Sequence, residues 1–147
     1  VINRIDHAQS GAVMAFRLLD NMSMPAAEIC SVISAIGNHD ESTAQPVDAI
    51  SAALIIADKT DVRRSRVRNN DFLTFDIHDR VNFAVKKSSL YFNENKTAII
   101  LDLEIDTEIS PVIEYFEIFL NRMLLCKRAC SYLGLQFKMI VNGSSLL

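Results

Sequence analysis

The spacing of the apolar residues changes in the middle of the chain, and this change limits the folds that the chain can adopt. Before Ser88, apolar residues recur every three or four positions, as on the buried face of a helix. After it, the segment 97–106, TAIILDLEID, alternates apolar with acidic residues, as a strand with one buried face does. We therefore predict an α+β fold that is mainly α, with a helical part at 1–87 and a small strand–strand–helix–strand unit at 88–147.

The first part is expected to hold three main helices. The first follows Asp6 and runs to about residue 22, and the second begins near Pro25 and ends near residue 39. The third begins at Pro46 and would continue toward a cluster of arginines at 63–68. Gly11 lies one turn after His7 and would let another element approach closely. A shorter helix is expected at about 79–87.

The second part reads as a strand at 90–92, a turn, a strand at 97–106, a long helix and a final strand at 135–141. Ser110 and Pro111 precede the long helix, and Gly134 supplies its end. Three strands would leave two open sheet edges, which a second copy of the chain could cover. We therefore expect that this unit can support a homo-oligomer.

Composition favours a folded domain and limits its partners. Half of the 147 residues are hydrophobic, charged residues make up 22%, and the mean hydropathy is +0.17. The formal charge of −3 gives no general attraction to nucleic acid or to an anionic membrane. No segment approaches the roughly 18 consecutive apolar residues of a membrane span. Three cysteines without a framework spacing favour a reduced, cytoplasmic chain in which Cys126 and Cys130 are buried thiols.

Three residues of the metal-ligand type fall on positions expected to face the core: His7, His39 and Asp58. Asp58 continues the face of the third helix that carries Ile50 and Leu54, so its carboxylate needs a partner. Taken singly, a histidine on an apolar face is more often a satisfied core residue than a ligand, and a buried aspartate is usually a cap or an ion-pair partner. Together, on three successive helices, imidazole nitrogens and a carboxylate suit one divalent metal ion.

The segments IDHAQSGAVMAFRLL, VISAIGNHDE and AALIIADKTD resemble the later part of the HD-domain metal-dependent phosphohydrolases. The likeness covers about residues 4–70. It implies a helical domain that binds a divalent metal ion, with Mn, Fe, Mg, Co, Ni and Zn not distinguished. His7 and His39 would be late histidine ligands of that family, and Asp58 the closing aspartate within a helix.

The doublet His39-Asp40 does not match the family's defining His-Asp doublet, because it lies too close to Asp58. On this alignment the early histidine and the defining doublet would precede Val1. We expect that a preceding segment supplies them. The other interpretation is a degenerate, non-catalytic relative.

The resemblance implies hydrolysis of a phosphomonoester or nucleotide by a metal-activated water. Asp40 is the candidate catalytic residue that orients this water, although a solvated position at a helix end explains it equally well. Lys59, Arg63 and Arg64 are candidates to bind the substrate phosphate, since guanidinium groups bind phosphate in a bidentate manner. Lys59 could also be a surface lysine, and the arginines a solvated face paired with nearby acids.

Two other functions are compatible with the sequence. The run RRSRVR at 63–68 could bind nucleic acid, but the acidic net charge and the absence of interleaved aromatic residues make this unlikely as a main role. A regulatory or assembly module with a degenerate HD domain is the main alternative to the enzyme.

Overall fold

The computed structural model describes residues 5–69 and 71–146. Five α-helices and a four-stranded sheet form this part of the chain, with two short 3₁₀ turns between α3 and α4. In chain order the elements are α1 (His7–Asn21), α2 (Ala26–Gly37), α3 (Ala49–Thr60), η1 (Arg64–Arg66), η2 (Phe72–Thr74), α4 (Ile77–Ala84), β1 (Val85–Phe92), β2 (Ala98–Ile105), α5 (Val112–Tyr132), β3 (Gln136–Val141) and β4 (Ser144–Ser145).

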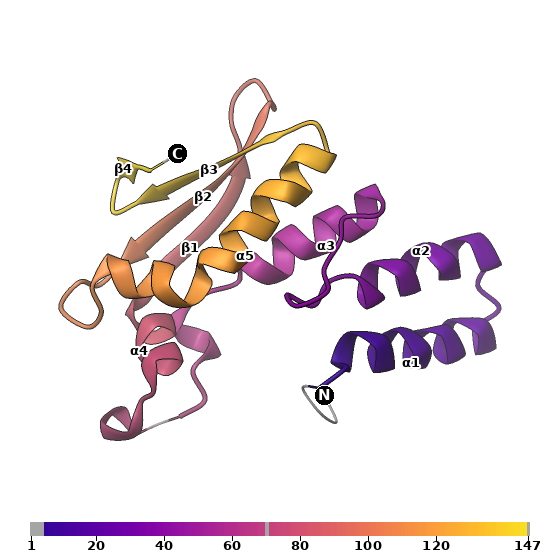
Figure 1. Ribbon diagram of the computed structural model, residues 1–147, viewed down its shortest axis with the longest axis horizontal. Helices are drawn as coiled ribbons and strands as arrows, with labels where there is room; N and C mark the ends of the chain where they lie inside the picture. The colour runs from indigo at the N-terminus through magenta and orange to yellow at the C-terminus, as the bar shows by residue number, and fades with distance from the viewer. Residues whose placement is uncertain (1–4, 70, 147) are drawn as a thin grey trace.

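The sheet has the order β1-β2-β3-β4 and is mixed (Figure 1). β1 and β2 pair antiparallel through the turn at 93–97, where the Asn93 side chain accepts hydrogen bonds from the backbone N–H groups of Thr97 and Ala98. β3 lies parallel to β2 because α5 carries the chain back across the sheet between them. Asn142 and Gly143, both with positive φ, form the turn to β4, which pairs with the outer edge of β3.

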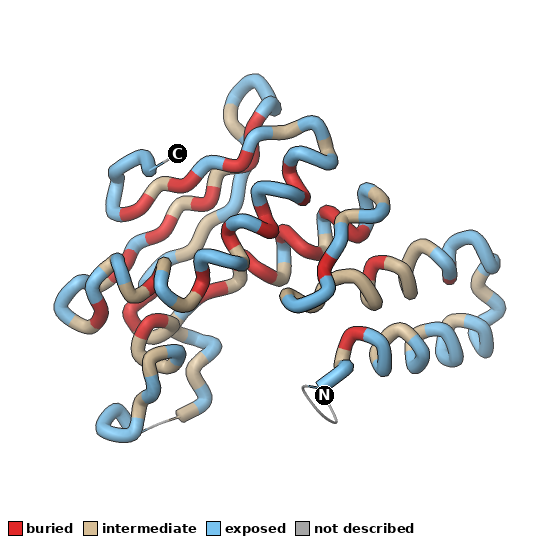
Figure 2. Tube along the Cα trace, viewed as in Figure 1, coloured by how far each residue is buried: buried red, intermediate tan, exposed pale blue. Residues whose placement is uncertain are grey.

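The core lies between one face of the sheet and the two helices α3 and α5, which pack against each other (Figure 2). β2 supplies every second residue to it, and the residues between them face the other side of the sheet. α5 contributes one long stripe of buried side chains. The buried residues of these two elements include Ile99, Leu101, Leu103, Ile105, Tyr115, Phe119, Met123, Cys126 and Cys130.

Local interactions fix the ends of the two packed helices. Asp48 and Ser51 form a capping box at the start of α3, with each side chain bonded to the other's backbone N–H. At the end of α5, Gly134 has a φ of 72°, which favours glycine. The N–H groups of Gly134 and Leu135 bond to the carbonyls of Ser131 and Cys130, which is the Schellman arrangement.

α1 and α2 form an antiparallel hairpin that projects from the body of the molecule (Figure 1). Gly11 of α1 faces Ile36 of α2 so closely that a Cβ atom at Gly11 would lie 3.3 Å from Ile36 Cγ2. The close approach expected at Gly11 is therefore confirmed. Large apolar side chains of α1 remain exposed, among them Val13, Met14, Phe16 and Leu18.

The α+β class is confirmed, with more helix than strand, and so is the strand–strand–helix–strand order of the second part. The first strand begins earlier than expected, at Val85, so the proposed boundary between 87 and 88 lies inside β1. α3 also packs against α5 of the second part. The division into domains 1–87 and 88–147 stays a prediction.

The third helix differs from its expected course in two ways. It ends at Thr60, because Val62 is completely buried and takes the chain into the core, so the arginine cluster does not continue the helix. Its buried face is also rotated from the expected one. Ile55, Ile56 and Lys59 are buried, whereas Ile50 is 52% exposed. The expectation that Asp58 extends a buried Ile50 face is wrong.

No helix in the described ranges combines the length and the apolar character that a membrane crossing needs. All three cysteines are free thiols: Cys30 is exposed, and Cys126 and Cys130 are buried in α5 as expected. Burial raises the pKa of the Cys126 thiol to about 12 and that of Cys130 to about 11.

We predict that Cys30 alone reacts with a disulfide reagent in the native protein at mildly alkaline pH. Thiolates are the reactive species, and burial keeps Cys126 and Cys130 protonated as well as covered. Absorbance of the released thiol should therefore report one fast equivalent in the native state and three after denaturation. A Cys30→Ser variant is the control and should show no fast equivalent. Rapid reaction of all three native thiols would contradict the packing of α5.

Candidate functional site

The hairpin of α1 and α2 brings the two predicted histidine ligands together. His7 is the first residue of α1, and His39 follows the end of α2, so the antiparallel arrangement places them at the same end. Their Nε2 atoms lie 3.2 Å apart, and the ring planes are nearly perpendicular at 80°. The contact between Gly11 and Ile36, one turn from each histidine, sets this distance by letting the helices approach closely.

Hydrogen bonding fixes the proton position on His39. Its Nδ1 atom bonds to the carbonyl oxygen of Ile36. A carbonyl can only accept, so Nδ1 carries the hydrogen and Nε2 of the neutral ring presents a lone pair. Metal-binding histidines commonly donate their second N–H in this way. The His39 ring is therefore oriented with Nε2 toward His7, where it accepts a hydrogen bond from His7 Nε2.

The separation of the two Nε2 atoms suits a shared metal ion. Nitrogens bound about 2.1 Å from one metal in adjacent positions are roughly 3.0–3.4 Å apart, and the observed distance is 3.2 Å. Among the described residues, no group of three or more His, Cys, Asp or Glu side chains is close enough together to hold a metal. The two histidines could supply two ligands, and the same 3.2 Å separation is that of the hydrogen bond between the two rings.

Asp58 does not join the histidines in this arrangement. It lies in the last turn of α3, and its Oδ2 atom accepts a hydrogen bond from Lys59 Nζ at 2.7 Å. The Asp58 side chain is 39% exposed, whereas that of Lys59 is only 7% exposed. The buried ammonium therefore holds the carboxylate of Asp58 as its ion-pair partner.

Asp40 lies between the histidine pair and α3. Its Oδ1 atom is 3.9 Å from His7 Nδ1, and its Oδ2 atom accepts a hydrogen bond from Ser42 Oγ. This bond from Ser42 lowers the pKa of Asp40, and the charges of His7 and Lys59 add to the effect against the opposing influence of burial. The carboxylate is thus ionised at neutral pH and can accept a proton or a hydrogen bond.

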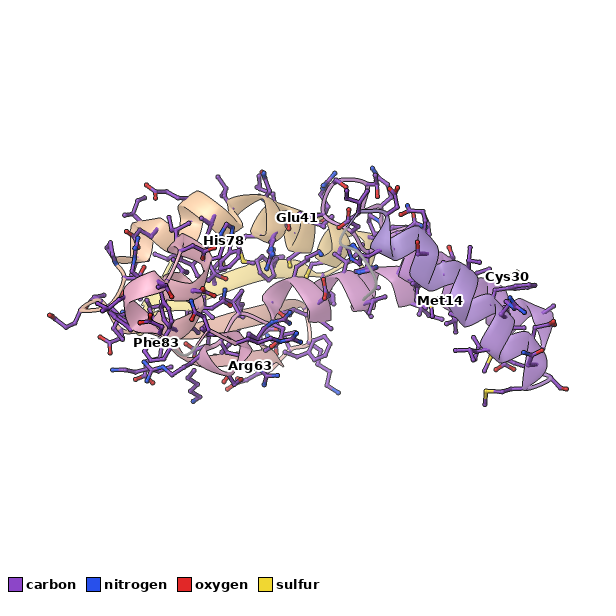
Figure 3. All side chains as sticks on the ribbon, turned by 90° about the horizontal axis from the view of Figure 1, so that it is seen from below. Met14, Cys30, Glu41, Arg63, His78 and Phe83 are labelled. Carbon is purple, nitrogen blue, oxygen red and sulfur yellow. The ribbon has the colours of Figure 1, made fainter. Side chains whose placement is uncertain are left out.

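The predicted phosphate-binding arginines lie elsewhere and already have partners. Arg63 forms an ion pair with Asp61 at 2.9 Å, and Arg66 shares the same carboxylate at 2.6 Å. Arg64 donates to the carbonyl of Phe83 and stacks on its ring, with 4.3 Å between the guanidinium carbon and the ring centroid. Figure 3 shows Arg63 on the opposite side of the molecule from Glu41, the residue that follows Asp40.

A second feature adjoins the candidate centre and was missed by sequence reasoning. The loop 38–48 runs along α5 and is attached at two points. Arg122 Nε donates to Glu41 Oε2 at 2.9 Å, and Tyr132 Oη donates to the carbonyl of Val47 at 3.0 Å. Between these attachments lies a cavity of about 840 Å³ lined by Glu41, Ser42, Asn121, Leu124, Lys127, Arg128 and Ser131. Its signal in the sequence is the set of polar residues Asn121, Lys127, Arg128 and Ser131 on the long helix.

Comparison of the chain with models of protein families, with curated proteins and with solved structures finds no significant match. The functional argument therefore depends on the residues and their geometry.

We predict that Ser42→Ala raises the pKa of Asp40. A hydrogen bond to the charged form lowers a carboxyl pKa, so its removal shifts the pKa back toward the ordinary value of 3.8. A depressed folded-state pKa contributes stability above the unfolded-state pKa and loses it as the pH falls through the folded-state value. The variant should therefore lose less stability between neutral pH and acid. NMR titration measures the pKa of the Asp40 carboxyl. Urea unfolding at neutral and at acidic pH measures the change in the free energy of unfolding.

The exposed Ser10 provides a matched control for this serine substitution. Ser10→Ala should leave the Asp40 titration unchanged. An unshifted Asp40 pKa in Ser42→Ala would show that the hydroxyl does not stabilise the carboxylate in solution.

Proposed function

We propose that this protein is a metal-dependent phosphohydrolase that acts on a phosphomonoester or nucleotide. The observation that carries the proposal is the pair of His7 and His39 Nε2 atoms, 3.2 Å apart, with the His39 ring oriented by its bond to Ile36. The likeness of these segments to the HD-domain family supports the same conclusion. In this proposal α1, α2 and α3 form the later part of an HD-type helical bundle.

His7 and His39 would hold a divalent metal ion, and Asp58 would be the anionic ligand. Asp58 has to exchange its bond with Lys59 for the metal, and Lys59 Nζ would then be available to a phosphate oxygen. When bound, the metal supplies an activated water and polarises a phosphoryl oxygen. The identity of the metal is open among Mn, Fe, Mg, Co, Ni and Zn.

Asp40 is the proposed catalytic residue. Its carboxylate accepts hydrogen bonds, so it can orient the attacking water. The Ser42 hydroxyl keeps one oxygen of Asp40 in place, which leaves the other for the water. Arg63 and Arg64 remain proposed phosphate ligands only if they leave Asp61 and Phe83.

The proposed partner is a small phosphorylated substrate, and the proposed location is the cytoplasm. A homo-oligomer through the C-terminal unit is compatible with the exposed edge strand β1, on which Leu90, Tyr91 and Phe92 are at least 42% exposed. Nucleic acid is a less suitable partner, because Arg63, Arg64 and Arg66 of the basic run all have protein partners.

A non-catalytic regulatory or assembly module is the alternative. The exposed apolar side chains of α1, including Val13 at 65% and Leu18 at 61%, favour it because such faces commonly contact another protein segment. The two functions differ in their dependence on the histidines: assembly through α1 needs neither His7 nor His39.

We predict that the full-length protein holds stoichiometric metal and that His39→Ala and Asp58→Ala both lose it. Removing a direct ligand should cost more than the roughly 10–100-fold in affinity that outer-shell changes cost. Elemental analysis after repletion and desalting measures the content, and phosphate release from nucleotides measures the activity.

His78→Ala is the matched control, since His78 is exposed on α4, a helix that carries none of the proposed ligands (Figure 3 labels His78). It should retain metal and activity. Wild-type protein without metal after repletion, or His39→Ala protein with full metal, would remove the enzyme proposal and favour the assembly module.

A further inference from the structure

The cavity between the loop 38–48 and α5 has the size of a small-molecule site. Its volume of about 840 Å³ lies within the roughly 300–1,000 Å³ range of ligand pockets. The cavity is an open groove on the surface, with the loop on one side and α5 on the other. The bonds from Arg122 to Glu41 and from Tyr132 to Val47 hold the two sides together. Figure 3 shows Glu41 beside α5.

The wall contributed by α5 is suited to an anion. Lys127 and Arg128 are exposed in the cavity, and neither forms an ion pair with any residue in the described part of the chain. Asn121 and Ser131 add neutral hydrogen-bonding groups, and Leu124 adds an apolar surface. The only acid of the lining, Glu41, is already paired with Arg122. The cavity therefore has two cations without a counter-charge.

The cavity is connected to the candidate metal centre through two neighbouring residues. Ser42 lines the cavity and donates to Asp40 Oδ2, and Asp40 Oδ1 lies 3.9 Å from His7 Nδ1. A ligand in the cavity would thus lie next to the residues that the proposed function assigns to catalysis. A substrate that spans both places needs an anionic group beyond the phosphoryl group that reacts.

We propose that this cavity is a substrate-binding pocket in which Lys127 and Arg128 bind a second phosphate of the substrate. This inference rests on the proposed phosphohydrolase function and narrows its substrate class to nucleotide-sized molecules with two or more phosphates. Arg128 supplies a planar group for two phosphate oxygens, and Lys127 supplies a point charge. The C-terminal unit then contributes substrate recognition to the centre formed by α1, α2 and α3.

Calorimetric titration in the presence of a chelator measures ligand binding to the pocket while no metal is bound and no substrate is turned over. The probes are ADP, pyrophosphate and adenosine, added to the full-length protein. ADP and pyrophosphate should bind, adenosine should bind at least tenfold more weakly than ADP, and the double variant Lys127→Ala/Arg128→Ala should lose about tenfold or more of the ADP affinity. Added salt should weaken ADP binding, since the contact is ionic.

Two further variants separate the pocket from general effects of charge and folding. Arg17→Ala/Lys138→Ala removes the same charge from exposed positions on α1 and β3 and should bind ADP as wild type does. Arg128→Lys keeps the charge and should lose less affinity than Arg128→Ala. Circular dichroism melting identifies any variant that is unfolded.

The outcomes distinguish the pocket from the enzyme. Unchanged ADP affinity in the double variant, equal loss in the Arg17/Lys138 control, equal binding of adenosine, or no binding of ADP and pyrophosphate would overturn the pocket. If the protein takes up no metal but binds ADP, and the double variant weakens that binding, the pocket is supported and the phosphohydrolase function is contradicted. If the protein takes up metal and releases phosphate, and the double variant does not change ADP affinity, the enzyme function is supported and the pocket is contradicted.

Discussion

The packing of α5 against the sheet and α3 forms the core from which the rest of the structure extends. One stripe of this helix, including Tyr115, Phe119 and Cys126, is removed from water, and truncation of a buried aromatic residue of this kind typically costs about 3–5 kcal/mol. The same helix carries Arg122 and Tyr132, which attach the loop 38–48. The face of α5 that packs in the core and the face that holds the loop 38–48 therefore belong to one helix.

The histidine pair depends on a separate constraint within the α1–α2 hairpin. Gly11 has no side chain, so Ile36 can approach it closely and the ends of the two helices lie close together. The bond from His39 to the Ile36 carbonyl then turns the ring toward His7. Both effects involve Ile36 near the end of α2, first with Gly11 of α1 and then with His39. The geometry of the pair is therefore set by the hairpin itself and not by the core beneath it.

Much of the fold could be predicted because its signals are local. The alternation of Ile99, Leu101 and Leu103 identified β2, and Gly134 identified the end of α5. The meeting of His7 and His39 followed from their places at the ends of successive helices and from Gly11. The rotation of α3 could not be predicted in this way, because Ile50 and Ile55 are equally apolar and only packing against α5 decides which is buried. The cavity was missed because its two sides are distant in the sequence: Glu41 and Arg122, which join them, are 81 positions apart.

The attachment of the loop has a consequence for the dynamics of the protein. The two bonds from α5 join residues 81 and 85 positions apart in the sequence, and they are surface polar contacts, which contribute on the order of 1 kcal/mol each. Unfolding the core requires several times that free energy. Ala44 of the same loop is buried in the core. Only the parts of the loop on either side of Ala44 can therefore separate from α5 in a local opening that leaves the sheet intact.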